Sequence, residues 1–548
     1  MRKYIATLVL ATACWGMQQA KAQSETDAFR LSHTAPLGGT ARFQAMGGAF
    51  ASLGGDPSSV TQNPAGIGVY RNSEISISFD NTSQMNRANW YNNNSKHKTS
   101  YFRSPNFSAI GSYYDRYSGN GFTFGFNRQN LARYNRSFKI SSGQPIDFSL
   151  ADYAALITPD QAKPEDLLPR TNFDPYKSSN YSWLSILAYE AGWTQKNKQG
   201  AYETQFFYPN RNGNYVPFGP SEAHINWREK GSVEAYDFTF GFNHRDRYYF
   251  GFSLRYTDIE YALASSYAED FMDGDYLILG NELWTRGGGF SVSLGTILRP
   301  VGGLRVGLAY FSPTWMVLQD GFFASAKSRY SHALDNEGKP VPKDQWILNG
   351  KTPKDATSSY RLSSPSRFVV GLGYTFGSQG LISLDYELTP YNTMTLRDMQ
   401  GESYFSVDNQ AIEKHYGLAQ TIRIGAEYKP ISRLSLRLGS VITTSPMKKG
   451  QGLTSFDKNT TPILTAGTLP HYMIPTGSLT FTGGIGYRMS RSFYIDLAFV
   501  NSKTINHVYS FPTLSDSKGN PIGDFTSPQS IRLSENTLKT IFTLGYKF

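Results

Sequence analysis

TLKTIFTLGYKF, residues 537–548, ends the chain with side chains that alternate between apolar and polar. Successive side chains of a strand point to opposite sides, so an extended strand here has two different faces. One face is apolar and is formed by Leu538, Phe542, Leu544, Tyr546 and Phe548. The other is mostly threonine, lysine and glycine. A single strand of this kind also suits a soluble sandwich, so its recurrence decides the fold.

The same alternation recurs along the chain and predicts about fourteen strands. We expect them near residues 77, 110, 124, 239, 253, 292, 307, 371, 385, 425, 436, 482, 496 and 543. Short connections are expected near 115–119, 244–247, 300–303, 377–380, 429–433 and 489–491. Long loops are expected at 84–103, 130–231, 261–284, 319–361, 395–417, 443–476 and 505–534. An even strand number with short turns at one end and long loops at the other is typical of an outer-membrane barrel. The predicted fold class is all-β, a transmembrane antiparallel β-barrel.

The two ends of the chain agree with this location. Residues 1–22 read as a signal peptide, with Arg2 and Lys3 before an apolar stretch and Ala-Lys-Ala at 20–22 as the cleavage site. Cys14, the only cysteine, lies inside it, and a degenerate lipidation box there stays an alternative. Phe548 resembles the terminal aromatic read by the barrel-insertion machinery. The predicted mature chain has no apolar run of about 18 residues, so it would cross lipid only as a closed barrel.

Composition argues against several functions. The net charge is +10, but basic residues are scattered and form no tract, so we expect no nucleic acid as a partner. The eight histidines show no ligand-like i, i+4 pair, and we expect no metal and no cofactor. No catalytic constellation is visible, so an enzyme is not expected. An acidic stretch at 269–275 reads as a solvated loop, with weak calcium binding as the alternative.

Arginines on the polar faces of the strands should point into the lumen. The clearest are Arg255, Arg305, Arg423 and Arg437. Two interpretations stay open: a mutually paired, hydrated interior, or arginines that hold a plug or an anionic ligand.

The segment before the first strand, residues 23–70, does not alternate and is rich in Gly-Gly pairs. A fourteen-stranded barrel is too wide for side chains alone to fill, so we expect this segment inside the lumen, with Asp56 meeting interior arginines. Residues 28–70, with the element Asp-x-Ser-Ser-x-x-x-Asn-Pro-Ala-Gly ending at Gly66, resemble the N-terminal hatch of the FadL/TodX outer-membrane transport family. Asn63, Pro64 and Ala65 match the hatch motif, and Gly66 follows it.

The resemblance implies a hatch at 23–70, a barrel at 71–548 and passive transport of hydrophobic molecules such as long-chain fatty acids. The loop at 130–231 is expected to hold short amphipathic helices at 150–157 and 183–193. Two interpretations of their apolar side chains stay open: packing of the loop against itself, or the apolar collecting groove that the resemblance implies, for which the candidates are Trp183, Leu184, Leu187 and Trp193. A sideways exit near the third strand would fit Gly121, Gly125 and the break at 127–130.

The location implied is the outer membrane of a Gram-negative bacterium. The expected partners are a hydrophobic small molecule, outer-membrane lipid and lipopolysaccharide, and the protein is expected to be a monomer. Two other functions stay open: a surface receptor or adhesin that binds haem or a host ligand, and a general porin.

Overall fold

The computed structural model describes residues 25–33, 38–179, 181–209, 215–333, 339–354, 356–400, 405–448, 454–456, 467–515 and 529–548. The predicted signal peptide and Cys14 lie outside these residues. Every helix in the described ranges is too short or too polar to cross a membrane.

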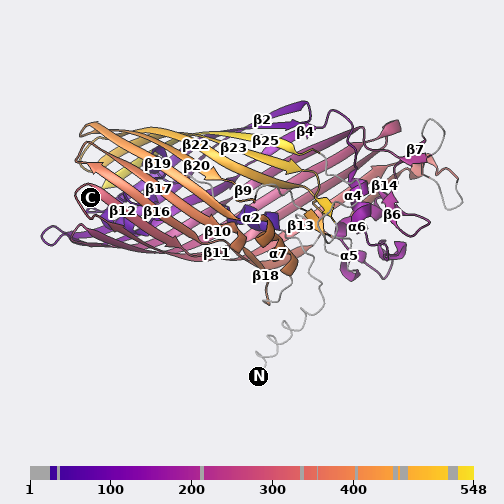
Figure 1. Cartoon of the computed structure of the whole chain (residues 1–548), viewed down its shortest axis with the longest axis horizontal. Helices are drawn as coiled ribbons and strands as arrows, with labels where there is room; N and C mark the ends of the chain where they lie inside the picture. Colours follow the sequence, from indigo (N-terminus) through magenta and orange to yellow (C-terminus); the bar gives the residue numbers. More distant parts are fainter. Residues whose placement is uncertain are drawn as a thin grey trace, which may run out of the picture.

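Fourteen antiparallel strands form a closed barrel, which confirms the predicted fold class (Figure 1). Each strand pairs with the next, and β1 pairs with β25 to close the ring, for example Ile77 opposite Leu544. Three strands are interrupted and carry two labels each. The wall consists of β1 (Glu74–Trp90), β2 (Asn93–Asp115), β3 (Asn120–Tyr134), β9 (Glu222–His244), β10 (Tyr248–Asp270), β11 (Tyr276–Leu298), β12 (Leu304–Phe311) with β13 (Trp315–Arg329), β15 (Thr357–Ser363) with β16 (Arg367–Phe376), β17 (Gly380–Pro390) with β18 (Thr395–Asp398), β19 (Leu418–Ile431), β20 (Leu434–Thr444), β22 (Tyr472–Arg488), β23 (Phe493–Tyr509) and β25 (Ile531–Lys547).

Burial alternates along the strands as the sequence pattern requires. In β10, Phe250, Leu254 and Tyr256 are exposed on the outer face, whereas Gly251 and Ser253 are buried on the inner face. An outward apolar face suits contact with lipid, and a polar inner face suits a hydrated lumen.

All six predicted short turns join strands at one end of the barrel. The C-terminus lies at this end, where Phe548 and Ser73 exchange backbone hydrogen bonds of 3.0 and 3.1 Å. The loops predicted at 84–103 and 261–284 are wrong, because both segments are mostly strand. β9, β10 and β11 each have 23 residues, about twice the 9–11 that cross a bilayer. In 84–100 polar side chains occupy both faces, so the alternation fades while the ladder continues. In 261–284 the alternation continues with the opposite sense, because apolar side chains such as Tyr261, Leu263 and Leu279 point inward and are buried.

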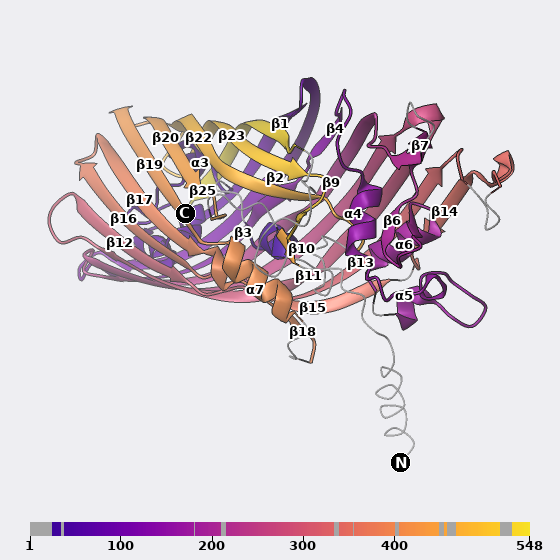
Figure 2. The same cartoon turned by 45° about the vertical axis from the view of Figure 1, so that its right-hand side comes forward.

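Helices and short strands gather at the opposite, long-loop end, as Figures 1 and 2 show for α4, α5 and α6. These elements are β4 (Ser137–Ser141), α4 (Leu150–Ile157), η3 (Pro164–Asp166), α5 (Pro175–Ser178), α6 (Trp183–Glu190), β5 (Thr194–Lys196), β6 (Tyr202–Thr204), β7 (Phe207–Pro209), β8 (Tyr215–Pro217), η4 (Met272–Gly274), η5 (Lys343–Gln345), β14 (Ile347–Lys351), η6 (Tyr391–Thr393), α7 (Ser406–His415), β21 (Thr454–Phe456) and β24 (Thr513–Ser515).

The N-terminal segment contains α2 (Glu25–Ser32), α3 (Ala41–Ala45), η1 (Pro57–Thr61) and η2 (Pro64–Val69). η2 contacts β3, β9, β10 and β11, whereas α3 contacts β20, β22, β23 and β25 on the other side of the ring. Contacts with opposite walls mean that the segment lies between them, as Figure 2 shows for α3. Its apolar side chains Phe43, Met46, Phe50 and Ile67 are fully buried.

Candidate functional site

Inward-facing glycines bring the wall and the N-terminal segment into direct backbone contact. A Cβ added at Gly251 would overlap the amide nitrogen of Ala65, and one added at Gly439 would overlap that of Gly47. A Cβ would likewise meet backbone atoms of the N-terminal segment at Gly241, Gly307 and Gly425, and would first meet its side-chain atoms at Gly295, Gly371 and Gly484. We call these eight residues the glycine belt. Because glycine has no side chain, the belt leaves room for a segment that packs backbone to backbone.

The predicted hatch motif forms a buried turn at this contact. Asn63 caps η2, its Oδ1 accepting from the amide of Ala65 at 3.0 Å, and Pro64 occupies the first position of the helix. The Asn63 Nδ2 donates to the carbonyl of Ala51 at 2.7 Å and to that of Thr296, on β11, at 2.9 Å. The turn therefore ties two parts of the N-terminal segment to the wall. Asn and Pro are the residues expected at the cap and first position of such a helix.

Asp56 has different partners from those expected. It accepts hydrogen bonds from Thr40 Oγ1 at 2.8 and 2.9 Å and from the amide of Ser58 at 2.9 Å. Arg42 lies near but is bonded to Glu427 at 3.2 Å. The predicted bond from a wall arginine to Asp56 is therefore wrong, because the carboxylate is used to cap η1. Burial raises the pKa of Asp56 to about 6.

Three of the four predicted lumen arginines pair with carboxylates of neighbouring strands. Arg255 binds Asp237 at 2.7 Å and Arg423 binds Glu387 at 2.8 Å. Arg437 bridges Glu427 at 2.7 Å and Asp496 at 2.5 Å.

The fourth, Arg305, instead donates to the carbonyl of Leu53 in the N-terminal segment at 2.7 Å. Arg367, which the sequence analysis did not single out, donates likewise to the carbonyl of Thr61 at 2.6 Å. Arg255, Arg423 and Arg437 are thus paired within the wall. Arg305 and Arg367 instead bond to the N-terminal segment.

Two cavities that share lining residues lie beside α2 in the lumen. The upper, nearer the long loops and of about 260 Å³, is lined by α2 and by residues of β1, β2, β3, β9, β20, β22, β23 and β25. The lower, of about 140 Å³, reaches Thr61 and Gln62 in the N-terminal segment. His33, Leu131 and Thr443 line both cavities. Burial lowers the pKa of His33 to about 4, so its imidazole is neutral at pH 7.

The wall beside the upper cavity is interrupted. The ladder between β2 and β3 ends at Asn106 opposite Gln129, next to Pro105, which has no N–H to donate. The unpaired edges, residues 101–105 of β2 and 130–134 of β3, line the upper cavity through Tyr101, Arg103 and Asn130–Tyr134. We call this interruption the wall window.

Side chains close the wall window at its borders. Arg103 donates to Asn130 across it, and Arg128 donates to the carbonyl of Ser104 at 3.3 Å. Towards the long-loop end, Asn93 Nδ2 donates to Ser141 Oγ of β4 at 2.9 Å. Gly121 and Gly125, two of the residues that suggested a sideways exit, lie in the regular part of the ladder. The break follows the predicted stretch 127–130, with a register shift against β9 between Asn130 and Ala132.

The four predicted groove residues lie in the outer loops but form no exposed groove. Leu184, Leu187 and Trp193 have 0% of their surface exposed. Trp183 packs at 5.1 Å from the rings of both Tyr176 and Phe322. The predicted α4 and α6 exist, but they pack against each other, and α6 packs on β13 and β14. The apolar side chains are therefore used for packing within the outer loops, one of the two interpretations, and the groove interpretation is wrong.

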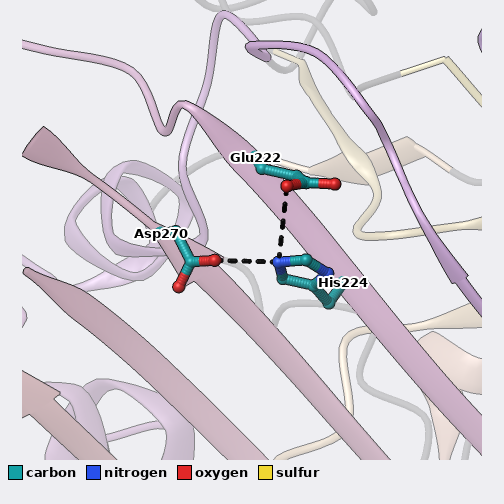
Figure 3. Close-up of side chains that lie close together, drawn as sticks. All are labelled: Glu222, His224 and Asp270. Atoms are coloured by element: carbon teal, nitrogen blue, oxygen red, sulfur yellow. Dashed lines mark hydrogen bonds and ion pairs between the residues drawn. The ribbon is translucent and has the colours of Figure 1, made fainter. Parts of the chain in front are cut away.

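One group of potential metal ligands lies within the described part of the chain, and the sequence analysis missed it. Glu222 and His224 share a face of β9, and Asp270 lies opposite Glu222 on β10 (Figure 3). His224 Nε2 is 2.8 Å from Asp270 and 4.0 Å from Glu222. Such donors can bind Zn²⁺, but here they already bond β9 to β10 and line neither lumen cavity. The sequence does show Glu222 and His224 two residues apart, which places both on one face of a strand. That spacing indicates a ligand group only when the strand register brings Asp270 opposite them.

The sequence matches no protein-family model and no curated protein. Among solved structures, the fold is similar to that of a Pseudomonas aeruginosa FadL homologue, with 12% identity, 94% of this chain and 100% of that chain covered, and a TM-score of 0.50. The Pseudomonas putida toluene transporter TodX matches with 12% identity, 93% and 98% coverage and a TM-score of 0.45. The Ralstonia pickettii toluene transporter TbuX matches with 14% identity, 95% and 100% coverage and a TM-score of 0.40. The likeness to the FadL homologue shows a shared fold.

Proposed function

We propose that this protein is a channel of the Gram-negative outer membrane that admits hydrophobic or amphiphilic small molecules, such as long-chain fatty acids, by passive diffusion. The observation that carries the proposal is the wall window, because the upper lumen cavity is lined by both of its unpaired edges. A molecule dissolved in the lipid could exchange with that cavity sideways. An apolar solute would then avoid crossing a polar aqueous mouth.

The lining of the upper cavity suits an amphiphile. Phe29, Leu131, Met473 and Val500 supply apolar surface. Polar groups line the same cavity from β20, β22, β23 and β25, among them Thr443, Ser478, Thr480, Ser502, Thr504, Asn506, Thr537 and Lys539, and charged side chains such as Arg103 and Glu535 also reach it. A ligand with an apolar tail and one polar end can contact both kinds of group, since a polar end needs partners when it leaves water.

We further propose that residues 38–70 act as a hatch. Asn63, Arg305 and Arg367 bond this segment to the wall, and the glycine belt packs against its backbone. These contacts are individually modest, so ligand entry into the lower cavity could release the hatch without unfolding the barrel. The resemblance of the motif from Asn63 to Gly66 to the family hatch supports the same role.

The test is flux into vesicles that contain the full-length protein. We expect faster entry of oleate, a long-chain fatty acid, than into protein-free vesicles, and no faster entry of a small sugar. Equal acceleration of the sugar would identify a general porin. Acceleration of neither solute would favour a surface receptor or adhesin and contradict the proposal.

A further inference from the structure

A polar cavity of about 350 Å³ opens at the short-turn end of the barrel, below the N-terminal segment. Its lining has more cations than carboxylates. The cations are Arg42, Lys429, Arg433, Arg437, Arg488, Arg491 and Lys547, and the carboxylates are Asp56, Glu74, Glu427 and Asp496. We call it the basic mouth. It is separate from the two cavities that carry the proposed transport function.

The carboxylates of the basic mouth already have partners. Glu427 binds Arg42 at 3.2 Å, Arg437 at 2.7 Å and Lys429 at 3.4 Å. Glu74 binds Lys547 at 3.2 Å and accepts from the Tyr494 hydroxyl at 2.6 Å. Asp496 binds Arg437, and Asp56 is bonded to Thr40. No carboxylate of the lining is therefore left to neutralise a further arginine.

Arg433, Arg488 and Arg491 are exposed and make no side-chain hydrogen bond or ion pair with any described residue. Arg433, in the turn just before β20, lies beside Arg488 of β22, since the amide of Arg488 donates to the carbonyl of Arg433 at 2.9 Å. Like charges placed side by side on a sheet repel each other. A bound anion between them would turn this repulsion into attraction.

The surroundings indicate which anion this is. The outer faces of the same strands and turns carry exposed apolar side chains, Tyr428, Ile431, Tyr487 and Met489. Aromatic residues beside basic ones are typical of the level where hydrocarbon meets headgroups. A soluble anion would need the arginines but not this apolar rim, whereas a lipid uses both.

We propose that the basic mouth binds the phosphate headgroup of an anionic phospholipid through Arg433, Arg488 and Arg491. The planar guanidinium suits phosphate because it donates two parallel hydrogen bonds. The acyl chains would lie along the outer face beside Tyr487 and Met489. The proposal rests on the proposed function only for the placement of this end in a membrane.

The experiment is native mass spectrometry of the full-length protein in detergent, titrated with phosphatidylglycerol or phosphatidylcholine. We expect phosphatidylglycerol to bind at least tenfold more tightly. The variant R433Q/R488Q/R491Q should lose about a hundredfold in affinity for phosphatidylglycerol, from roughly fivefold for each basic residue near an anionic headgroup. Equal binding of both lipids, or unchanged binding by the variant, would overturn the proposal.

Two controls keep the result specific. R87Q/K96Q/K98Q removes the same charge from exposed residues of the β1–β2 hairpin and should bind phosphatidylglycerol like the wild type. An equal loss of affinity in this control would mean that net charge alone explains the effect, and it would overturn the site.

If the triple glutamine variant does not fold, two other variants replace it. R433K/R488K/R491K, which keeps the charge, should lose less affinity for phosphatidylglycerol than R491Q does. Competition by inorganic phosphate at the same concentration as the lipid would show an adventitious ion only. Oleate flux is a separate readout, so either proposal can fail alone.

Discussion

Replacing Asn63 with alanine should release the N-terminal segment while leaving the barrel intact. The change removes the cap of η2 and the two hydrogen bonds of 2.7 and 2.9 Å from Nδ2 to Ala51 and Thr296. A lost cap costs about 1 kcal/mol and each lost buried hydrogen bond about 1 kcal/mol. The cap and the bond to Ala51 lie within the segment, so the total of roughly 3 kcal/mol, about a hundredfold, applies to a release that also unfolds η2. The bond to Thr296 joins the segment to the wall, and its loss alone shifts the balance between bound and released segment by about 1 kcal/mol, about fivefold. The strand ladders do not depend on this side chain.

The assay is ion conductance through the purified protein in a planar bilayer. N63A should open more often than the wild type, with the same heat-dependent gel mobility of a folded barrel. N72A is the matched control, because Asn72 is exposed just beyond the segment and should leave conductance unchanged. If N63A conducts no more than the wild type, the motif does not hold the segment in the lumen and the reasoning fails.

Three further predictions concern the belt, the buried carboxylate and the chain end. G439V should displace the segment and raise conductance, because its side chain would overlap Met46 and Gly47, whereas G302V, with open space around it, should not. Burial raises the pKa of Asp56 from 3.8 to about 6. Between pH values of about 4 and 6, the Asp56 carboxyl is therefore protonated when the segment is bound in the lumen and ionised when the segment is released. Segment binding should therefore weaken as pH rises from about 4 to 6 and stay constant above, and D56N should remove this dependence of conductance on pH. Deleting Phe548 should lower the amount of folded barrel in the membrane, measured by gel mobility without heating; normal amounts would show that the terminal aromatic is not needed.

The barrel could be predicted because lipid imposes a strict alternation on its strands. Residues 248–256 show it clearly, with large apolar side chains at every second position. The same rule explains the errors, since it operates only within the membrane. Residues 84–100, most of the loop predicted at 84–103, continue the ladder beyond the lipid, where polar side chains occupy both faces, and the sequence there does not look like a strand.

The site was less accessible to sequence reasoning, because packing partners decide it. Asn63 and Pro64 carry a local cap signal and were found. Gly439 is one of many glycines, and its role appears only when the segment from Met46 to Gly47 is seen against it. Trp193 looked like a surface residue of an apolar loop, but the strands beneath it extend far enough to bury it completely.

The most direct test of the proposed route is to lock the wall window. Cys14, the only native cysteine, lies in the predicted signal peptide, so R103C/N130C would place a single thiol pair across the window. We expect this variant to admit oleate into vesicles at least as fast as the wild type. Joining the two thiols with a short reducible cross-linker should stop the flux, and reduction should restore it. Unchanged oleate flux through the cross-linked protein would contradict entry through the wall.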